Sequence, residues 1–269
     1  MSNIETLKKE KSSSFRKLAI GSWGKPKNPT IYAKLTFDYS NCKTYLKESG
    51  LTQVSVNHVV AKALATIFKQ YPYLNRVLIR RSIYVRKHIS AFFNTHLRLG
   101  DDYDLLGVTI QDIDRLSLSE IEKKLKEKVL ELRQNKNKEM KKSKFLIQLF
   151  PSLLTKPVIK VFDFFMYSLN IDFSKFGLSK DPYGSFIVTS IGSFGMEEAY
   201  VPLFPFSRCG MVVAVGKPSK QVQIKNGTVQ EYDRVTLTFS LDHRLFDGAH
   251  FAKPLRLLKK IIEQPKTYL

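Results

Sequence analysis

The sequence predicts an α/β fold in which helices and strands are mixed along one domain. An apolar stripe at helical spacing follows Ser55, and a second amphipathic helix follows Gly248. Between them, the last third of the chain contains four short apolar runs that are typical of strands, at 185–192, 210–216, 222–230 and 234–242. No change of composition demands a second domain, although residues 135–182 have the character of an insertion.

The first half of the chain predicts one strand and two capped helices. Residues 31–39 alternate between apolar and polar side chains, as a half-buried strand does. Ser55 can cap a helix that Pro72 ends. A further helix is expected to begin at Ser117, because Glu120 three residues later completes a capping-box pattern.

In the last third, Asn226 and Gly227 stand between the apolar residues Ile224 and Val229 and predict a tight hairpin turn. Residues 234–242 alternate strictly between polar and apolar side chains and predict the strand that precedes the final helix.

The segment 135–182 combines a Lys-rich connector with the most apolar part of the chain. A helix is predicted from Pro157, with Lys160 and Asp163 on one narrow face. Charged residues and prolines interrupt it too often for a membrane span. We expect its apolar residues to be buried in the domain or in an oligomer interface, while contact with a membrane surface or a substrate channel stays open.

The net charge of +20 on 269 residues favours an anionic partner, such as a phosphorylated small molecule or a membrane surface. No nucleic-acid-binding motif accompanies this charge, so nucleic acid is not expected. The two cysteines, Cys42 and Cys209, form no pattern of a disulfide framework or zinc site. We expect a flexible polar tail at residues 1–13, no secretion signal and a cytoplasmic location, while peripheral contact with a membrane stays open.

The richest cluster of reactive side chains is LDHRLFDGAH at residues 241–250, where an apolar strand meets two histidines, two aspartates and an arginine. His243 can be an ordinary structural histidine or a general base. Metal binding by His243, Asp247 and His250 is the weakest alternative, because Gly248 interrupts the helix that would align them. We therefore expect no metal site.

DHRLFDG at residues 242–248 resembles the DHRxxDG signature of the acyltransferase core of 2-oxoacid dehydrogenase complexes, which shares its His-x-x-x-Asp-Gly centre with chloramphenicol acetyltransferase. FRKLAI at 15–20, the helix and Pro-x-x-Asn within 54–75, and FIVTSIGSFG at 186–195 are similar to other segments of that family. The resemblance covers most of the chain. It implies one catalytic domain at 14–269 with a mixed β-sheet flanked by helices, and an inserted helical segment at 135–182.

The resemblance implies a role for each matching residue. His243 would be the general base that activates a thiol or hydroxyl for attack on an acyl thioester. Thr189, at the position of a family serine, would stabilise the oxyanion, with Ser190 beside it as the second candidate. Asp247 would form a structural salt bridge with Arg16, and Arg244 would serve that bridge or a neighbouring subunit.

The resemblance also implies a homotrimer and acyl-coenzyme A as co-substrate, with no permanently bound cofactor. The coenzyme A contacts are not assigned. No lipoyl-bearing or subunit-binding segment is expected before the core, so a stand-alone acyltransferase with a small-molecule or lipid-like acceptor is the leading interpretation. The alternative is a catalytically inactive member that acts as a trimeric assembly or binding scaffold.

Overall fold

The structure is a computed structural model. It describes residues 3–9, 29–99, 102–131, 157, 160–161, 163–174, 180–204, 207–225 and 227–269. Arg16 and the expected Lys-rich connector at 135–144 lie outside these residues, so predictions about them stay predictions.

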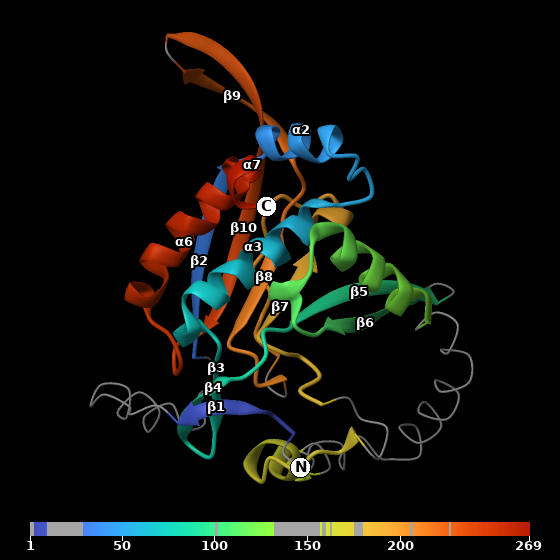
Figure 1. Ribbon diagram of the computed structural model, residues 1–269, viewed down its shortest axis with the longest axis vertical. Coiled ribbons are helices and arrows are strands. Elements are labelled where there is room, and N and C mark those ends of the chain that lie inside the picture. The colour runs from blue at the N-terminus through green and yellow to red at the C-terminus, as the bar shows by residue number, and fades with distance from the viewer. Residues whose placement is uncertain are drawn as a thin grey trace.

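A large mixed sheet organises the described part of the chain (Figure 1). Its strand order is β2-β10-β8-β7-β5-β6, and β9 pairs with β10. The strands are β2 (Thr30–Asp38), β5 (Ala91–Leu99), β6 (Asp102–Ile110), β7 (Phe186–Ser190), β8 (Met211–Val215), β9 (Ser219–Lys225) and β10 (Thr228–Asp242). β7 runs parallel to β5 and β8, whereas the other pairs are antiparallel. The predicted mixed sheet is therefore confirmed.

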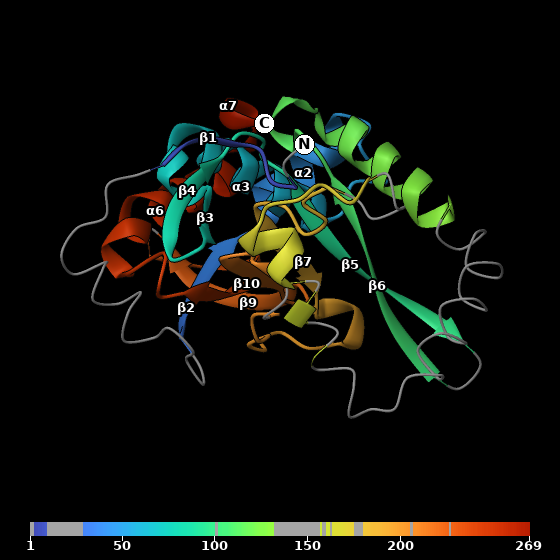
Figure 2. The same cartoon turned by 90° about the horizontal axis from the view of Figure 1, so that it is seen from below.

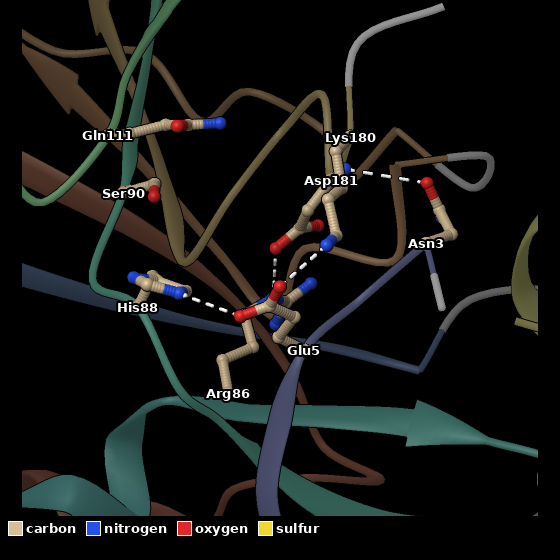
Figure 3. Close-up of a pocket in the computed structure, with 8 residues that line it drawn as sticks. All are labelled: Asn3, Glu5, Arg86, His88, Ser90, Gln111, Lys180 and Asp181. Carbon is tan, nitrogen blue, oxygen red and sulfur yellow. Dashed lines mark hydrogen bonds and ion pairs between the residues drawn. The ribbon is translucent and has the colours of Figure 1, made fainter. Parts of the chain in front are cut away.

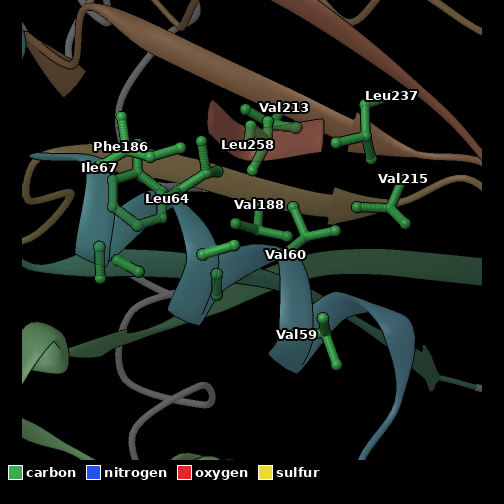
Figure 4. Close-up of a cluster of buried hydrophobic side chains, with 14 of the residues drawn as sticks. Val59, Val60, Leu64, Ile67, Phe186, Val188, Val213, Val215, Leu237 and Leu258 are labelled. Carbon is green, nitrogen blue, oxygen red and sulfur yellow. The ribbon is translucent and has the colours of Figure 1, made fainter. Parts of the chain in front are cut away.

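Helices α3 (Val56–Gln70) and α6 (Gly248–Glu263) cover one face of this sheet. The helices α2 (Ser40–Glu48) and α7 (Pro265–Tyr268) lie near its β2–β10 edge. Figure 4 shows Val60 and Leu64 of α3 facing Val188 of β7 and Val213 of β8, with Leu258 of α6 beside them. These side chains belong to the main hydrophobic core, and its apolar burial fixes the sheet against the two helices.

The opposite face of the sheet carries a row of hydroxyls. Thr236, Thr238 and Ser240 of β10 are buried there, and the Thr238 hydroxyl donates to the backbone oxygen of Ala199. The segment around Ala199 lies close to the sheet at Gly216, where an added Cβ would come within 2.0 Å of the Glu197 backbone oxygen. This face therefore presents polar groups beneath a surface segment.

A smaller sheet of order β1-β4-β3 lies below the large one in Figure 1. Its strands are β1 (Thr6–Lys9), β3 (Arg76–Ile79) and β4 (Ser82–Arg86). The π-helical segment η3 (Phe164–Ser168) packs on it through Met166 and Tyr167, in a cluster with Ile4, Val77 and Ile79. Seen from below in Figure 2, the small sheet and this yellow segment lie at the same end of the molecule.

Several sequence predictions are confirmed. Ser55 caps α3, and α3 ends before Pro72. The Ser117 hydroxyl accepts from the backbone N–H of Glu120, while the Glu120 carboxylate accepts from the backbone N–H of Ser117, at 3.3 and 2.7 Å. A helix follows at residues 118–131, as the capping box predicts.

Other predictions need correction. Residues 3–9 of the expected flexible tail are ordered, because β1 pairs with β4 and Ile4 is buried. The predicted strand at 234–242 is the second half of one strand, β10, which begins at the hairpin. The prediction that the apolar residues after Pro157 are buried in the domain is correct for Met166, but Val161 and Phe165 are exposed. The prediction used the periodicity of a regular α-helix. The π-helical turn has a different periodicity, so other side chains face the small sheet.

β1 is attached by a cluster of charges around Glu5 (Figure 3). The Glu5 carboxylate lies 2.6 Å from Lys180 Nζ, 3.0 Å from His88 Nε2 and 3.3 Å from Lys87 Nζ. Lys180, followed by His88 and Lys87, lowers the pKa of Glu5 to about 2. The hydrogen bond from His88 Nδ1 to Asp112, 2.8 Å long, and then the bond to Glu5 raise the pKa of His88, although partial burial opposes this. The imidazolium form therefore joins two carboxylates.

The His88 contacts predict a pH-dependent stability. Because the pKa of His88 is raised on folding, its stabilisation should be complete below the ordinary value of 6.5 and should be lost as pH rises through the folded-state pKa. The free energy of unfolding should be measured in urea for wild type and His88→Gln at several pH values, from below 6.5 upward. The difference between the two proteins should be largest at the acid end. Lys87→Gln is the control, since Lys87 stays charged throughout. A difference between wild type and His88→Gln that does not change with pH would contradict this account.

Candidate active site

The turn after β10 places His243 at the end of the longest strand. β10 ends at Asp242, whose backbone oxygen accepts hydrogen bonds from the backbone N–H groups of Leu245 and Phe246, 2.9 and 3.0 Å long. The His243 N–H donates to the Pro29 oxygen just before β2. Helix α6 begins at Gly248. The chain therefore reverses tightly here, between a buried strand and a packed helix.

The imidazole of His243 has a defined hydrogen-bonding pattern. Its Nδ1 lies 2.7 Å from the backbone oxygen of Phe246. A carbonyl oxygen can only accept, so Nδ1 carries the proton in this contact, and the neutral ring then has its lone pair on Nε2. His243 is partly exposed. This contact thus defines the orientation of the ring at the turn.

Asp242 and Arg244 form an ion pair across the turn. Arg244 Nε lies 3.0 Å from Asp242 Oδ1, and its Nη2 lies 2.7 Å from Oδ2. The Asp242 side chain is buried, and Oδ1 also accepts from the Arg244 backbone N–H. The pair satisfies the carboxylate at the strand end. In this chain Arg244 therefore pairs with Asp242.

Asp247 holds the start of α6 through His250. Its Oδ1 lies 2.6 Å from His250 Nδ1, and the two residues form a capping box. On the other side of the ring, Arg76 Nη1 lies 3.1 Å from His250 Nε2 and 3.2 Å from the backbone oxygen of Leu245. His250 Nδ1 also lies 3.3 Å from the Asp247 backbone nitrogen, so the ring contacts both the carboxylate and the backbone of Asp247 on one side and Arg76 on the other. The predicted bridge from Asp247 to Arg16 lies outside the described residues.

Tyr73 completes this support. Its hydroxyl donates to the His250 backbone oxygen at 3.1 Å, and the Arg76 guanidinium lies over its ring at 5.8 Å from the centroid. Tyr73 and Arg76 were not among the predicted site residues, and His250 was considered only as a metal ligand. Tyr73 lies within the Pro-x-x-Asn stretch and Arg76 follows it, but only the tertiary structure brings them to the turn.

Thr189 and Ser190 lie on opposite faces of β7. Thr189 is level with Ala214 of β8 and Thr238 of β10, and it is buried on the hydroxyl-bearing face. Ser190 instead lines a cavity of about 180 Å³ on the helical face, with Ser55 and His58 at the start of α3. Burial lowers the pKa of His58 there. The two candidate hydroxyls therefore lie in different environments, on opposite faces of the sheet.

Strand register separates His243 from Thr189 within the chain. Thr189 is level with Thr238, two strands away. His243 lies five residues further along, so the two Cα atoms are about 20 Å apart, from a rise of about 3.3 Å per residue and a strand spacing of about 4.8 Å. A base and an oxyanion donor must both lie about 3 Å from the reacting groups. A site that used both side chains on one thioester would therefore need them from different copies.

Two further observations concern ligands and membranes. Among the residues that the structure describes, no group of three or more His, Cys, Asp and Glu side chains is arranged to hold a metal ion. Both ring nitrogens of His250 already contact protein groups. Within the same residues, no helix combines the length and apolar character needed to cross a membrane.

Comparison with known proteins agrees with this architecture. The family model described as 2-oxoacid dehydrogenases acyltransferase (catalytic domain) matches residues 29–153 and 179–269. Component 3 of the mitochondrial pyruvate dehydrogenase complex of Arabidopsis thaliana, a dihydrolipoyllysine-residue acetyltransferase, is 25% identical over 249 residues, which cover 89% of this chain and 37% of that protein. The chain spans about a fifth to two fifths of the length of such curated relatives.

Solved structures show the same fold. A probable dihydrolipoamide acetyltransferase from Listeria monocytogenes 4b F2365 aligns with a TM-score of 0.61 at 21% identity, over 96% of this chain and 95% of that chain. The cubic core of a pyruvate dehydrogenase multienzyme complex aligns with a TM-score of 0.63 at 17% identity, over 97% and 94%. The family model covers most of the sequence, including the turn with His243 and the strand with Thr189. The chain belongs to the family of 2-oxoacid dehydrogenase acyltransferase catalytic domains.

Proposed function

We propose that this chain transfers an acyl group from a thioester, acyl-coenzyme A, to a thiol or hydroxyl acceptor. Membership of the acyltransferase family supports acyl transfer in general. The observation that carries the specific mechanism is the hydrogen bond from His243 Nδ1 to the Phe246 backbone oxygen. It leaves Nε2 as the nitrogen that takes a proton.

The proposed reaction begins when His243 Nε2 removes the proton of the acceptor thiol or hydroxyl. The acceptor sulfur or oxygen then attacks the thioester carbonyl, and a tetrahedral oxyanion forms. Collapse of this intermediate breaks the bond to the coenzyme A sulfur. The proton on Nε2 passes to the departing thiolate, so His243 returns to its neutral form.

Thr189 is the proposed donor to the oxyanion. The estimated separation of about 20 Å from His243 of the same copy requires a second copy to complete each site. Thr189 lies on the face away from α3 and α6, and its side chain is buried within one copy, so a shared site requires the thioester to enter beside it. We therefore propose a homotrimer in which His243 of one subunit and Thr189 of the next share a site.

Asp247, His250 and Arg76 are proposed as positioning residues. The Asp247 carboxylate caps α6, and Arg76 donates to both His250 and the Leu245 oxygen. The turn carries His243, and these contacts hold the turn against β3. A shift of the turn would move Nε2 away from the acceptor and lower the rate without removing the base.

Other parts of the function stay predictions. These are the residues that contact coenzyme A, the lipid-like nature of the acceptor and the cytoplasmic location. The net charge of +20 suits the phosphates of coenzyme A, although one such ligand requires only a small part of it.

The general-base role predicts the behaviour of His243→Ala. Wild type should release free coenzyme A thiol from one or more acyl-coenzyme A donors, short to long, with dihydrolipoamide or a small hydroxyl acceptor. His243→Ala should lose about 100-fold or more of this activity, because proton transfer typically contributes that much. The variant should keep the wild-type sedimentation behaviour. If neither wild type nor His243→Ala releases thiol with any donor, the interpretation as a binding scaffold replaces the interpretation as an enzyme.

The two hydroxyl candidates are separated by Thr189→Val and Ser190→Ala. Thr189→Val keeps the side-chain shape and should lower kcat about 100-fold, as expected for loss of an oxyanion donor. Ser190→Ala is the matched control, since Ser190 faces the other side of β7. A loss in Ser190→Ala with normal Thr189→Val activity would reverse the assignment.

The positioning role of Arg76 predicts a split between kcat and KM. Arg76→Gln should lower kcat about 10-fold to 100-fold with little change in KM, because the base is displaced while substrate contacts persist. Arg234→Gln is the control, because Arg234 pairs with Glu197 at 2.8 Å on the surface. Reduced thermal stability with unchanged kcat would show a purely structural role for Arg76.

A further inference from the structure

The π-helical end of the molecule exposes an unusual group of apolar side chains. Phe164 and Val161 are 51% and 54% exposed, and Phe165 is 39% exposed. Leu169 and Ile171 continue the same exposed group. Single exposed apolar residues are ordinary, but this concentration within eleven residues indicates a contact surface. We call residues Val161, Phe164, Phe165, Leu169 and Ile171 the aromatic ridge.

The aromatic ridge is held rigidly on the small sheet. The Leu169 N–H donates to the Phe164 oxygen at 2.8 Å, which is the five-residue spacing of a π-helix. Between them, Met166 and Tyr167 are buried against Val77 and Ile79. This turn therefore buries one pair of side chains and presents Phe164 and Phe165 outward, and such π-helical turns are frequent at functional sites.

Two arginines lie beside the aromatic ridge. Arg80 and Arg81 form the two-residue turn between β3 and β4, with φ angles of 48° and 66°. Both side chains are exposed, and Arg80 Nε donates to the Ser168 oxygen. Turns of this kind favour Asn-Gly, because positive φ is unfavourable for residues with a side chain such as arginine. Strain of this sort is commonly found where a function requires the side chain.

The charge around the ridge is positive. Lys160 is exposed at its start, and Lys9 of β1 is exposed on the adjacent sheet. Two acidic residues lie within the segment. Asp163 is paired with Arg208, whose Nε lies 3.0 Å from its Oδ1, and Asp172 accepts a hydrogen bond from the Ser174 N–H at 2.8 Å. The surface therefore combines exposed phenyl rings with several cations, and of its two carboxylates that of Asp163 is paired with an arginine.

We propose that the aromatic ridge and the Arg80–Arg81 turn form a docking site for an anionic lipid surface. Arginines bind lipid phosphates, and phenylalanine side chains enter the boundary between headgroups and acyl chains. Charge complementarity selects this occupant over a second copy, because two copies that meet through this surface would bring their arginine pairs together. The proposal does not depend on acyl transfer.

The test is flotation of the full chain with vesicles of phosphatidylcholine alone and with vesicles that also contain phosphatidylglycerol. Wild type should float only with the anionic vesicles. Arg80→Gln with Arg81→Gln should weaken binding about 30-fold, the effect expected for two arginines near an anionic surface. Phe164→Ser with Phe165→Ser should weaken it about tenfold or more, because buried phenyl contacts are lost.

Matched controls separate this surface from the general positive charge. Lys123→Gln with Lys126→Gln removes the same charge from an exposed helix, and Val222→Ser with Ile224→Ser removes apolar side chains from the β9–β10 hairpin at the other end of the molecule. Both controls should bind vesicles as wild type does. The proposal is overturned if these controls lose as much binding as the test variants. It is also overturned if the phenylalanine variant changes the sedimentation mass instead of vesicle binding.

All four variants should release thiol from soluble donors at the wild-type rate, because the substituted residues lie away from the turn with His243. Loss of vesicle binding with normal thiol release supports the docking site. Failure of acyl transfer in wild type leaves the vesicle experiment unaffected, so the two proposals fail separately.

Discussion

The function that we propose depends on one hydrogen bond, from His243 Nδ1 to the backbone oxygen of Phe246. It exists because β10 ends in a tight turn whose backbone folds back on Asp242. The main core holds the strand before this turn, and the capped helix α6 holds the chain after it. A histidine on a loose loop would sample several orientations, whereas the imidazole of His243 is held between two rigid elements.

The strand β3 connects the two proposed sites. Its first residue, Arg76, supports the turn of His243, and its last, Ile79, leads into the arginine turn beside the aromatic ridge. Four residues of extended chain span about 13 Å, so docking at this end would bring the catalytic turn close to a lipid surface. This arrangement suits an acceptor or acyl chain that is held at a membrane, although each site can be tested alone.

The sequence predicted the parts of the structure that local pattern determines. Ser55 and the stripe after it predicted α3, and the strict alternation before Asp242 predicted the end of β10. His243 could be singled out because reactive side chains follow an apolar strand. The support from Tyr73 and Arg76 could not be predicted, since their contacts with His250 join residues 177 and 174 positions apart. The exposure of Phe164 and Phe165 was also missed, because a π-helical turn breaks the periodicity from which burial was inferred.

We propose that each active site is shared between copies, and subunit mixing tests this arrangement most directly. His243→Ala and Thr189→Val chains, each inactive alone, are unfolded, mixed and refolded together before thiol release is measured. A shared site predicts that activity returns, at about a quarter of the wild-type level for random mixing, because some interfaces then combine an intact His243 with an intact Thr189. If the mixture stays as inactive as its parents while it assembles normally, the two residues do not meet across an interface, and the proposed mechanism is wrong.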